Sequence, residues 1–579
     1  MIALRVMRRS PDPAAQLPAV LNPVLARAYA ARGVREPGQL ATTLDRLLPV
    51  LSLESVDRAA DLLLVHRGSG SHVLVIGDFD ADGATSTALI VRALRGWGFA
   101  RVDFLVPNRF QFGYGLTPEI VALAAEQNPT LIVTVDNGIS SHAGVQSARE
   151  RGIDVLVTDH HLPAAELPAA NVIVNPNLPD SKFGSRALAG VGVAFYVMAA
   201  LHRRLQESGE PPAAPAPADL LDLVALGTVA DLVPLDANNR VLVAQGLRRI
   251  RAGRCVPGIS ALLEIAKRSR DTLTAADLGY AVGPRLNAAG RLDDMSIGIR
   301  CLLADAPAEA LAIAARLDQL NVERRGIEAR MQEMATTAVK QAAARLGGRE
   351  RHGVCLYDAS WHQGVVGLVA GRIKERVRRP VIAFADAGDG TLRGSARSVP
   401  GVHIRDILER IATQRPGLVV KFGGHAMAAG LTLERARLDE FANAFDAQVA
   451  AWAGGAAALA DTVETDGELG VDEIALATAE SLREGGPWGQ GFPEPSFDGA
   501  FALTQTRVVG ERHLKMWVEH APSGRRFDAI AFNYFEGRAG SEPPQRARLI
   551  YRLDINHYGG ERRLQLLVDH VLPEDSAFC

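Results

Sequence analysis

The stretch "VLVIGDFDADGATST" (residues 73–87) decides the fold of the first part of this chain. An apolar run leads directly into three aspartates, Asp78, Asp80 and Asp82, and a helical pattern follows them. Carboxylates placed this close together repel one another and raise each other's pKa. The stretch therefore predicts a strand, an acidic turn and a helix, and the acidic turn predicts a cationic ligand.

Short apolar runs rich in β-branched residues return after this stretch. Two helical patterns, residues 84–98 and 117–128, separate the earlier runs. Apolar strands that alternate with helices are typical of a parallel sheet covered on both faces. The sequence therefore predicts such a sheet, built from the runs at residues 72–78, 101–108, 131–138, 154–161 and 171–176.

Polar groups stand at the carboxyl ends of two more of these predicted strands. Asp136 ends the third run, and Asp159, His160 and His161 end the fourth. The carboxyl ends of parallel strands share one edge of a sheet, and ligands bind beside that edge. Carboxylates combined with imidazole suit Mn²⁺, Mg²⁺ or a comparable divalent ion. Because several buried carboxylates need a counter-charge, we expect a metal site at this edge.

Two alternative interpretations of the acidic turn stand beside the metal site. An EF-hand loop begins with the same D-x-D-x-D-G pattern, but it requires a bidentate glutamate at its twelfth position. Counted from Asp78, that position is Leu89, and an apolar strand leads into the turn. Helix capping accounts for one aspartate, whereas three aspartates, together with Asp136 and two histidines on neighbouring strands, exceed what a cap needs.

The 579 residues are too many for one hydrophobic core, since single cores stop growing at about 250–300 residues. A long polar and apolar helix and a second α/β pattern follow the first sheet, and regular short strands after residue 490 are typical of a small barrel. The predicted domains are an N-terminal helical segment (1–45), a first α/β domain (46–300), a long connecting helix (301–348), a second α/β domain (349–452) and a β-barrel domain (453–579).

The composition is that of an ordinary globular protein, with 47% hydrophobic and 22% charged residues. The net charge of −3 does not indicate a nucleic acid partner, because the chain as a whole is not basic. Any site for a polyanion must therefore be a local basic patch. Four cysteines lie far apart and form no C-x-x-C pair, which predicts reduced, buried thiols. No apolar run has the length of a membrane span, and we expect a soluble cytoplasmic protein.

The acidic turn and the later clusters also resemble a known family. "DFDADGATST", "VDNGIS", "TDHH" and "ALGTVADLVPL", which supplies Asp231, are similar in order and interval to the signature blocks of the DHH phosphoesterase superfamily. Further blocks resemble those of one branch, the bacterial RecJ exonucleases: "FLVPNRFQFGYGL" (104–116), "GPRLNAAGRLDD" (283–294), "WHQGVVGLVAGRI" (361–373), "SARS" (395–398) and "KFGGHAMAAG" (421–430).

This resemblance implies an α/β protein with a parallel-sheet DHH catalytic lobe, a second α/β DHH-associated lobe joined to it by a long helix, and a C-terminal OB-like β-barrel. It implies a 5′→3′ exonuclease specific for single-stranded DNA that acts in recombination and repair. Two Mn²⁺ or Mg²⁺ ions would clamp the attacking and leaving oxygens and lower the pKa of a bound water to about 7, so that hydrolysis releases 5′-mononucleotides without a Ser or Cys nucleophile.

The resemblance also assigns the metal ligands. Asp80 and Asp136 would hold one ion, while Asp82, Asp136, His160 and Asp231 would hold the other. Asp78 and His161 would lie beside the ions, with His161 contacting the scissile phosphate or supporting a ligand. Asp159 would orient His160 or brace the turn, because metal-bound imidazoles usually need an acceptor behind them.

The second lobe and its neighbourhood are expected to bind substrate. Small residues of "KFGGHAMAAG" let backbone N–H groups approach a phosphate, and arginines in "SARS" and "PRLNAAGR" suit a terminal 5′-phosphate, although isolated arginines more often form surface ion pairs. Phe112 and Tyr114 stack a base or belong to a core. The predicted substrate-binding residues are Arg109, Arg285, Asn287, His362, Ser395, Arg397, Gly423, Gly424 and His425.

The predicted barrel carries the local basic patch that the net charge conceals. Residues 507–563 contain 11 Lys and Arg against 7 Asp and Glu. Basic grooves with aromatic platforms bind single strands with little sequence preference, although most aromatic residues of a small barrel belong to its core. The interleaved aromatic residues are Trp517, Phe527, Phe532, Tyr551 and Tyr558.

Two alternative functions remain open from the sequence. One is a DHH phosphodiesterase that acts on short oligonucleotides, although such relatives are shorter and lack the basic barrel. The other is a non-catalytic replication scaffold, although such relatives lose metal ligands that are present here. The resemblance further implies a monomer that works with a single-strand-binding protein and a helicase and that does not bind membranes.

Overall fold

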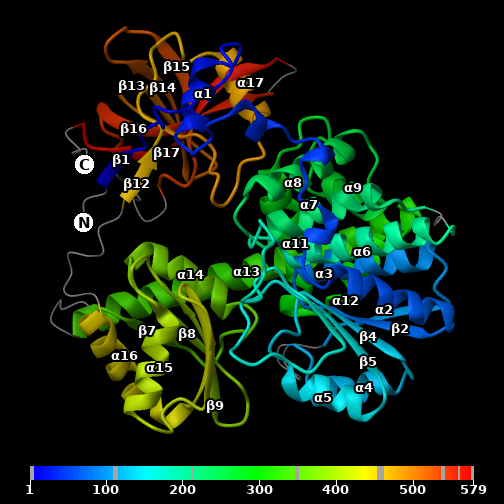
Figure 1. The fold of residues 1–579 in the computed structure, drawn as a ribbon. Helices are drawn as coiled ribbons and strands as arrows, with labels where there is room; N and C mark the ends of the chain where they lie inside the picture. The colour runs from blue at the N-terminus through cyan, green and yellow to red at the C-terminus, as the bar shows by residue number, and fades with distance from the viewer. Residues whose placement is uncertain are drawn as a thin grey trace. The chain divides into compact units, whose positions relative to one another are not determined.

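The computed structural model describes residues 5–107, 115–210, 214–345, 351–452, 462–535, 542–557 and 561–574 (Figure 1). The chain divides into two compact units. The large unit comprises residues 6–318 and 463–579, and the small unit comprises residues 319–462 together with the first five residues. The C-terminal barrel therefore belongs to the same compact unit as the first α/β sheet, although the small unit lies between them in the sequence.

A five-stranded parallel sheet forms the first part of the large unit. Its strand order is β3-β2-β4-β5-β6, and every neighbouring pair is parallel. All five residues of β2 are buried, as expected for a strand covered on both faces. The predicted parallel sheet is confirmed, with strands β2 (His72–Ile76), β3 (Arg101–Leu105), β4 (Leu131–Val135), β5 (Asp154–Thr158) and β6 (Val172–Val174).

Helices cover both faces of this sheet (Figure 1). On one face α4 (Pro118–Ala125) and α5 (His142–Glu150) pack against Leu74 and Ile76 of β2. On the other face α3 (Ala81–Gly96) contacts α6 (Gly190–Glu207) and α7 (Leu221–Ala230). This arrangement directs the carboxyl ends of the strands toward the start of α3, where the acidic turn lies.

Further helices complete the helical part of the large unit. The long helix α13 (Pro307–Arg345) leaves this unit and continues into the small unit. Residues 301–303, which the sequence placed in the connecting helix, belong to the preceding helix α12. The other helices of this part are α1 (Pro23–Ala30), α2 (Val56–Gly68), α8 (Ala237–Arg251), α9 (Pro257–Ile265), α10 (Ala275–Asp277), the π-helical turn η5 (Leu278–Val282), α11 (Gly283–Leu292) and α12 (Ser296–Leu303).

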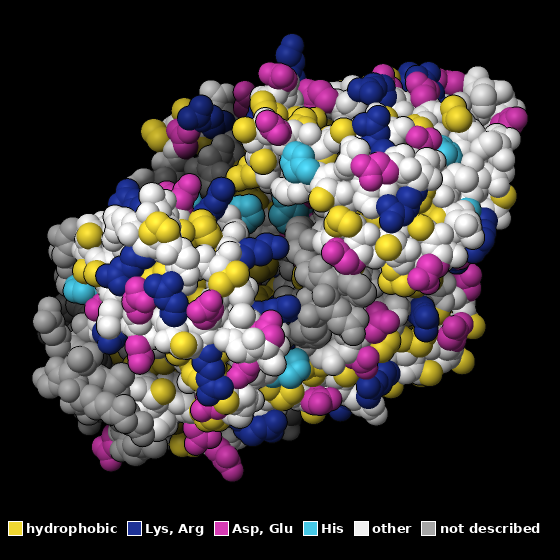
Figure 2. All heavy atoms as spheres, turned by 90° about the horizontal axis from the view of Figure 1, so that it is seen from below, with side chains coloured by type: hydrophobic (Ala, Val, Ile, Leu, Met, Phe, Trp, Pro, Cys, Tyr) yellow, Lys and Arg dark blue, Asp and Glu magenta, His cyan; other side chains and the backbone are white. Residues whose placement is uncertain are grey.

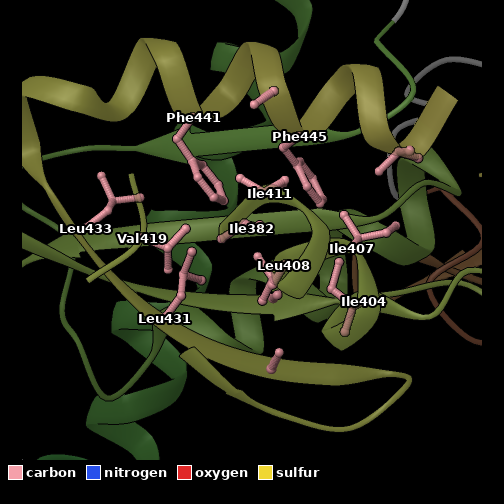
Figure 3. Packing of buried hydrophobic residues seen from close by; sticks show 14 of the residues in the cluster. Ile382, Ile404, Ile407, Leu408, Ile411, Val419, Leu431, Leu433, Phe441 and Phe445 are labelled. Atoms are coloured by element: carbon pink, nitrogen blue, oxygen red, sulfur yellow. The ribbon is translucent and has the colours of Figure 1, made fainter. Parts of the chain in front are cut away.

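The small unit is a mixed sheet covered by helices. Its strand order is β10-β11-β9-β8-β7, in which only the β7–β8 pair is parallel. Figure 3 shows Phe441 and Phe445 pointing from helix α16 into the apolar layer formed with Ile382 and Ile411. The elements are β7 (Val354–Tyr357), α14 (Val366–Val377), β8 (Val381–Asp386), β9 (Thr391–Arg397), α15 (Ile404–Gln414), β10 (Lys421–Gly424), β11 (Ala428–Glu434) and α16 (Leu438–Trp452).

The C-terminal strands close into a barrel in the order β13-β14-β15-β17-β16, so the predicted barrel is confirmed. The N-terminal segment packs beside it: Arg32 forms an ion pair with Asp466 at 2.6 Å, and both side chains are buried. This segment, expected to be helical, also contains strand β1 (Arg5–Arg8), which pairs with β12 (Thr462–Thr465). The remaining elements are α17 (Leu476–Glu484), β13 (Phe497–Val509), β14 (His513–His520), β15 (Arg526–Ala531), β16 (Arg546–Asn556) and β17 (Arg563–Leu572).

Among the described residues, Cys255, Cys301 and Cys355 are free thiols, as predicted, but only Cys301 is buried, whereas Cys255 and Cys355 are partly exposed. Cys579 lies outside the described residues. Burial raises the pKa of Cys301 to about 12, so its thiol stays protonated at neutral pH. No helix in the described ranges is both long enough and apolar enough to cross a membrane.

The core of the small unit depends on aromatic packing around Phe441. This side chain is fully buried, stacks with Phe445 at 6.1 Å between ring centroids and meets Phe384 edge-on at 5.9 Å. We expect Phe441→Ala to lower the free energy of unfolding of the small unit by about 3–5 kcal/mol, because the truncation leaves a cavity. Urea unfolding of the full chain, followed by hydrogen exchange in β8 and α16, measures this loss. Val420→Ala, at a side chain that is 59% exposed, is the control and should change stability by less than about 0.5 kcal/mol.

Candidate metal centre

The three aspartates of the acidic turn after β2 have different surroundings: one caps a helix, and the other two are buried. Asp80 is the N-cap of α3, and its Oδ1 accepts hydrogen bonds from the backbone N–H groups of Asp82 and Gly83, each at 3.0 Å. Capping therefore explains Asp80 in part, as the sequence allowed for one aspartate. Asp78 and Asp82 are both buried, which a surface cap does not require.

The N-terminus of helix α6 holds the carboxylate of Asp82. The backbone N–H groups of Gly190 and Val191 donate to its two oxygens at 2.6 and 2.9 Å. Orphan N–H groups and the positive end of the helix dipole stabilise an anion at this position. Sequence reasoning missed this contribution. The available signal was the small-residue run "ALAGVGVAF", which lets the start of a helix approach another chain segment closely.

Asp136 takes an unusual backbone conformation at the end of β4. Its φ is +60°, in the left-handed region that few residues other than glycine adopt. Such strain is concentrated at functional sites, where the surrounding structure enforces it. Gly190 packs directly against this residue, because a Cβ added there would lie 2.8 Å from the Cβ of Asp136. A side chain at position 190 would therefore displace Asp136.

The end of β5 supplies two histidines and the aspartate that braces them. Asp159 accepts hydrogen bonds from the backbone N–H groups of His160 at 2.7 Å, His161 at 3.1 Å and Ile139 at 2.9 Å. It also contacts Nδ1 of His161 at 2.8 Å. Asp159 thus braces the turn, as predicted, and it orients the ring of His161 instead of the ring of His160.

Asp231 comes from the helical layer and not from the sheet. It is the C-cap residue of α7, so its carboxylate lies at the negative end of the helix dipole. Gly227, one turn earlier, packs against the acidic turn, because a Cβ there would lie 2.9 Å from Oδ1 of Asp82. The close approach of α7 to α3 therefore brings Asp231 to the edge of the sheet.

These side chains converge on one place. Nε2 of His160 lies 3.0 Å from Oδ1 of Asp136, 3.6 Å from Oδ2 of Asp231 and 4.0 Å from Oδ2 of Asp82. Within the described part of the chain, three groups have potential ligand atoms that all lie within 4.8 Å of one another. The groups are Asp78, Asp80 and Asp136; Asp82, His160 and Asp231; and Asp136, His160 and His161.

The electrostatics of the cluster favour a cation. Burial, followed by the charge of Asp80, raises the pKa of Asp82 to about 7. Burial and the neighbouring carboxylates also raise the pKa of Asp136 and of Asp231 well above the usual range. Carboxylates in this position are stable as anions only beside a positive charge.

The pKa values of the two histidines are shifted in opposite directions. Burial lowers the pKa of His160 to about 4, so its imidazole is neutral at pH 7 and has a lone pair available. Its ring also donates a hydrogen bond to the backbone of Leu188, as metal-binding histidines do with their second nitrogen. Burial opposes protonation of His161, but the hydrogen bond to Asp159 and nearby carboxylates raise its pKa above the usual value.

The donor set fits divalent metal ions. Oxygens of four or more carboxylates and a neutral imidazole are the ligands that Mn²⁺ and Mg²⁺ accept in proteins. The shared position of Asp136 in two of the three groups would let one carboxylate contact two ions.

Two predicted substrate-binding residues lie in helix α11 of the same unit. Asn287 accepts a hydrogen bond from the backbone N–H of Ala81 at 2.7 Å, so it fixes the acidic turn. Arg285 forms an ion pair with Asp318 of α13 at 2.8 Å. Arg109, Phe112 and Tyr114 lie outside the described residues.

The small unit aligns most of its predicted substrate-binding residues across three adjacent strands. Gly430 of β11 stands opposite both Gly423 of β10 and Ser395 of β9. Gly424 ends β10 and His425 follows it, and the backbone N–H of His425 donates to the carbonyl of Ala428 at 2.8 Å.

Arg397 ends β9 beside the first turn of α14. A Cβ at Gly367 of that turn would lie 2.9 Å from Oγ of Ser395 and 3.0 Å from Nη2 of Arg397. Burial lowers the pKa of Arg397, and among the described residues no carboxylate forms an ion pair with it. His362 lies just before the same helix, where its Nδ1 accepts a hydrogen bond from the backbone N–H of Gly364 at 3.1 Å. A cationic group and a helix N-terminus together form a setting suited to an anion.

The barrel separates its predicted aromatic platforms into two groups. Phe527 and Tyr551 are buried in the barrel core, whereas Trp517 is 45% exposed and Phe532 is 56% exposed. Tyr558 lies outside the described residues.

Ion pairs neutralise much of the basic patch on the barrel. Lys515 pairs with Asp528, Arg526 with Glu519, and Arg552 with both Glu494 and Asp569. On the face of the molecule in Figure 2, basic and acidic side chains are likewise interspersed and form no extended patch of one sign among the described residues.

Three family descriptions match this chain. The DHH family N-terminal domain matches residues 72–228, the DHHA1 domain matches residues 339–451, and the RecJ OB domain matches residues 465–570. The first covers the parallel sheet and the acidic cluster, the second covers the small unit's sheet, and the third covers the barrel.

Curated relatives match over nearly the whole chain. The single-stranded-DNA-specific exonuclease RecJ of Dickeya dadantii (strain 3937) is 54% identical over 571 residues, which cover 98% of this chain and 99% of that protein. The protein of the same name from Escherichia coli (strain K12) is 52% identical over 577 residues, with the same coverage of both chains.

Solved structures match the fold as a whole. RecJ from Thermus thermophilus in complex with Mn²⁺ has a TM-score of 0.80 and 31% identity, and the match covers 99% of this chain and 80% of that chain. The complex of RecJ with Mg²⁺ from the same organism has a TM-score of 0.74. The predicted fold class is confirmed by these matches, and the chain belongs to the RecJ family of single-stranded-DNA-specific exonucleases within the DHH superfamily.

Proposed function

We propose that this protein degrades single-stranded DNA from its 5′ end by metal-dependent hydrolysis and releases 5′-mononucleotides. The observation that carries the proposal is the convergence of carboxylates and a neutral imidazole on Asp136, in a chain similar throughout to proteins named single-stranded-DNA-specific exonucleases. The same resemblance supports a cytoplasmic monomer that acts in recombination and repair with a helicase and a single-strand-binding protein.

Two Mn²⁺ or Mg²⁺ ions would be held by the cluster. Asp80 and Asp136, with Asp78 beside them, would hold one ion, and Asp82, Asp136, His160 and Asp231 would hold the other. When bound, a pair of divalent ions lowers the pKa of a water molecule and neutralises charge on the phosphate. The support for two ions is that Asp136 belongs to one group with Asp78 and Asp80 and to another with His160.

The other residues of the cluster stabilise the carboxylate of Asp82 and orient the ring of His161. Gly190 and Val191 favour the ionised form of Asp82 through two backbone hydrogen bonds, which lower its pKa and oppose the effect of burial. His161, whose pKa is raised, would donate a hydrogen bond to an oxygen of the scissile phosphate. Asp159 would hold the ring of His161 in the orientation that this contact requires.

Substrate would be bound by three further surfaces. In the small unit, Arg397, Ser395, Gly423, Gly424, His425 and His362 would bind the terminal 5′-phosphate or the backbone beside the cut. In the large unit, Arg285 and Asn287 would contact the backbone of the strand, as would Arg109, which lies outside the described residues, and Asn287 also fixes the acidic turn. The barrel would bind the strand through Trp517 and Phe532, whose rings are exposed.

Asp136→Ala is expected to reduce cleavage more than about 10³-fold, because it removes a ligand shared by both proposed ions. The assay uses a 5′-phosphorylated single strand with Mn²⁺, labelled at either end. With the wild type, labelled mononucleotide should appear from the start of the reaction when the label is at the 5′ end. When the label is at the 3′ end, labelled mononucleotide should appear only after a delay. DNA binding by the variant, measured by fluorescence anisotropy, should remain.

Asp305→Asn is the control for this variant, because the side chain of Asp305 is 88% exposed. It should cleave at the wild-type rate. Intact DNA after incubation of the wild type with Mn²⁺ would contradict the proposed function, and release from the 3′ label first would contradict the proposed direction.

Metal binding should release protons and become stronger as the pH rises from about 6 to about 8. The carboxyl group of Asp82 has a pKa of about 7 without metal, and those of Asp136 and Asp231 are also raised. These groups hold protons at the lower pH, and a metal ion must displace them. Calorimetric titration of chelator-treated protein with Mn²⁺, in two buffers of different ionisation enthalpy, counts the protons. Equal affinity at both ends of this pH range without proton release would contradict the ligand assignment.

Arg397→Ala should slow cleavage of a strand with a 5′-phosphate about 10-fold to 100-fold, as expected for loss of one charge-assisted contact. Cleavage of a strand with a 5′-hydroxyl should change much less, so the ratio of the two rates reports on the contact. Arg405→Ala, an exposed arginine of the same unit, is the matched control. An equal loss of rate on both substrates would show that Arg397 does not recognise the terminal phosphate.

A further inference from the structure

The large unit contains a cavity of about 640 Å³ that the proposed reaction does not use. One wall is formed by the end of α7, by α8 and by α10 with the π-helical turn η5. The other wall is the segment 483–494, which begins with the last two residues of α17 and leads into the barrel. Because all these parts belong to the large unit, the cavity lies within one compact body.

Direct contacts fix the two walls against each other. The backbone N–H of Leu235 donates to the carbonyl of Gln490 at 2.7 Å. The guanidinium of Arg240 stacks over the ring of Phe492 at 4.2 Å from its centroid. The segment also turns inward through Gly491, where an added Cβ would lie 3.2 Å from Pro234. The cavity therefore has a defined shape.

Three arginines of this cavity are bound only through neutral oxygen atoms among the described residues. Arg248 donates to the carbonyl and the hydroxyl of Thr42 at 3.0 and 2.6 Å. Arg251 donates to the carbonyl of Leu273 at 2.9 Å, and Arg483 donates to the carbonyl of Thr272 at 2.8 Å. The neighbouring Arg249, by contrast, does not line the cavity and pairs with Asp219.

The charge of the cavity is positive. Its lining contains five arginines and two glutamates, and one of these glutamates, Glu494, is paired with Arg552 at 2.7 Å. Burial, together with the like charges of Arg483 and Arg248, lowers the pKa of Arg251. Glu484, which also lines the cavity, and Asp277 attract Arg251 and partly offset this repulsion. Among the described residues no carboxylate forms an ion pair with any of the three guanidinium groups, and the surplus of arginines over glutamates favours binding of an anion. Their planar N–H groups match the oxygens of a phosphate.

An aromatic ring lines the same cavity. Tyr280 lines the cavity and is 85% exposed, which is exceptional for a large side chain. It lies in the π-helical turn η5, and π-helical turns occur frequently at functional sites. An exposed ring next to a cationic pocket offers a stacking surface for a base.

We propose that this cavity, here named the tri-arginine pocket, binds a nucleotide, with its phosphate against Arg248, Arg251 and Arg483 and its base against Tyr280. The volume lies within the range of small-molecule sites, which is about 300–1,000 Å³. The nucleotide has two potential sources, which are a unit of a bound single strand and a free mononucleotide. In either case the pocket is a nucleotide site additional to the metal centre.

Binding to full-length protein in EDTA tests this proposal without any cleavage, so its outcome is independent of the proposed nuclease activity. One arm titrates a fluorescent oligo(dT) strand, and the other titrates thymidine 5′-monophosphate by calorimetry. Arg251→Glu should weaken binding in at least one arm about tenfold or more, because it replaces a phosphate contact with a repulsive charge. Tyr280→Ala, at an exposed position, should weaken binding about fivefold or more through loss of stacking.

Arg254→Glu is the matched control, since it makes the same charge change at an exposed position just after α8, outside the pocket. Weaker binding of the strand alone identifies the ligand as part of bound DNA, and weaker binding of the mononucleotide identifies a site for free nucleotide. The proposal is overturned if Arg251→Glu and Tyr280→Ala bind both probes as the wild type does, or if Arg254→Glu weakens binding equally.

Discussion

The structure of the large unit depends on holding several buried carboxylates around one point. Asp82, Asp136 and Asp231 come from a turn, a strand end and a helix end, and each raises the energy of the others when ionised. The chain provides some compensation, since the N-terminus of α6 donates two hydrogen bonds to Asp82. The remaining negative charge requires a cation. The neutral imidazole of His160 faces the same point, and its lone pair is available to bind a metal ion.

Close packing of helices against the sheet makes this arrangement possible. Gly190 lets the start of α6 contact Asp136, and Gly227 lets α7 contact Asp82. The two helices present opposite ends to the cluster, because α6 directs its N-terminus there and α7 its C-terminus. The helix dipole of α6 therefore stabilises an anion, whereas that of α7 adds to the need for a metal ion.

Positive charge is distributed unevenly among the possible anion-binding surfaces. On the barrel, most arginines and lysines near the strands have carboxylate partners. The positive potential on the barrel is therefore weaker than the excess of basic residues suggests. Among the described residues, Arg397 in the small unit and the three arginines of the tri-arginine pocket form no ion pair, although Glu484 lies in the lining of that pocket. Guanidinium groups outside ion pairs indicate phosphate binding better than the number of basic residues does, because a paired carboxylate offsets the positive charge of its partner.

The sequence by itself determined the five strands of the first sheet, the barrel, and the side chains that meet at the acidic turn. Local periodicity and the shared edge of parallel strands are sufficient for these features except Asp231, which lies at the end of a helix and was assigned through the resemblance to the DHH superfamily. Only the tertiary structure decided which distant groups contact each other. Gly190 donates a hydrogen bond to Asp82, Arg285 forms an ion pair with Asp318, β1 pairs with β12, and Arg251 lines the same pocket as Arg483. Each of these contacts joins residues far apart in the chain, and no local pattern encodes a partner that only packing brings into reach.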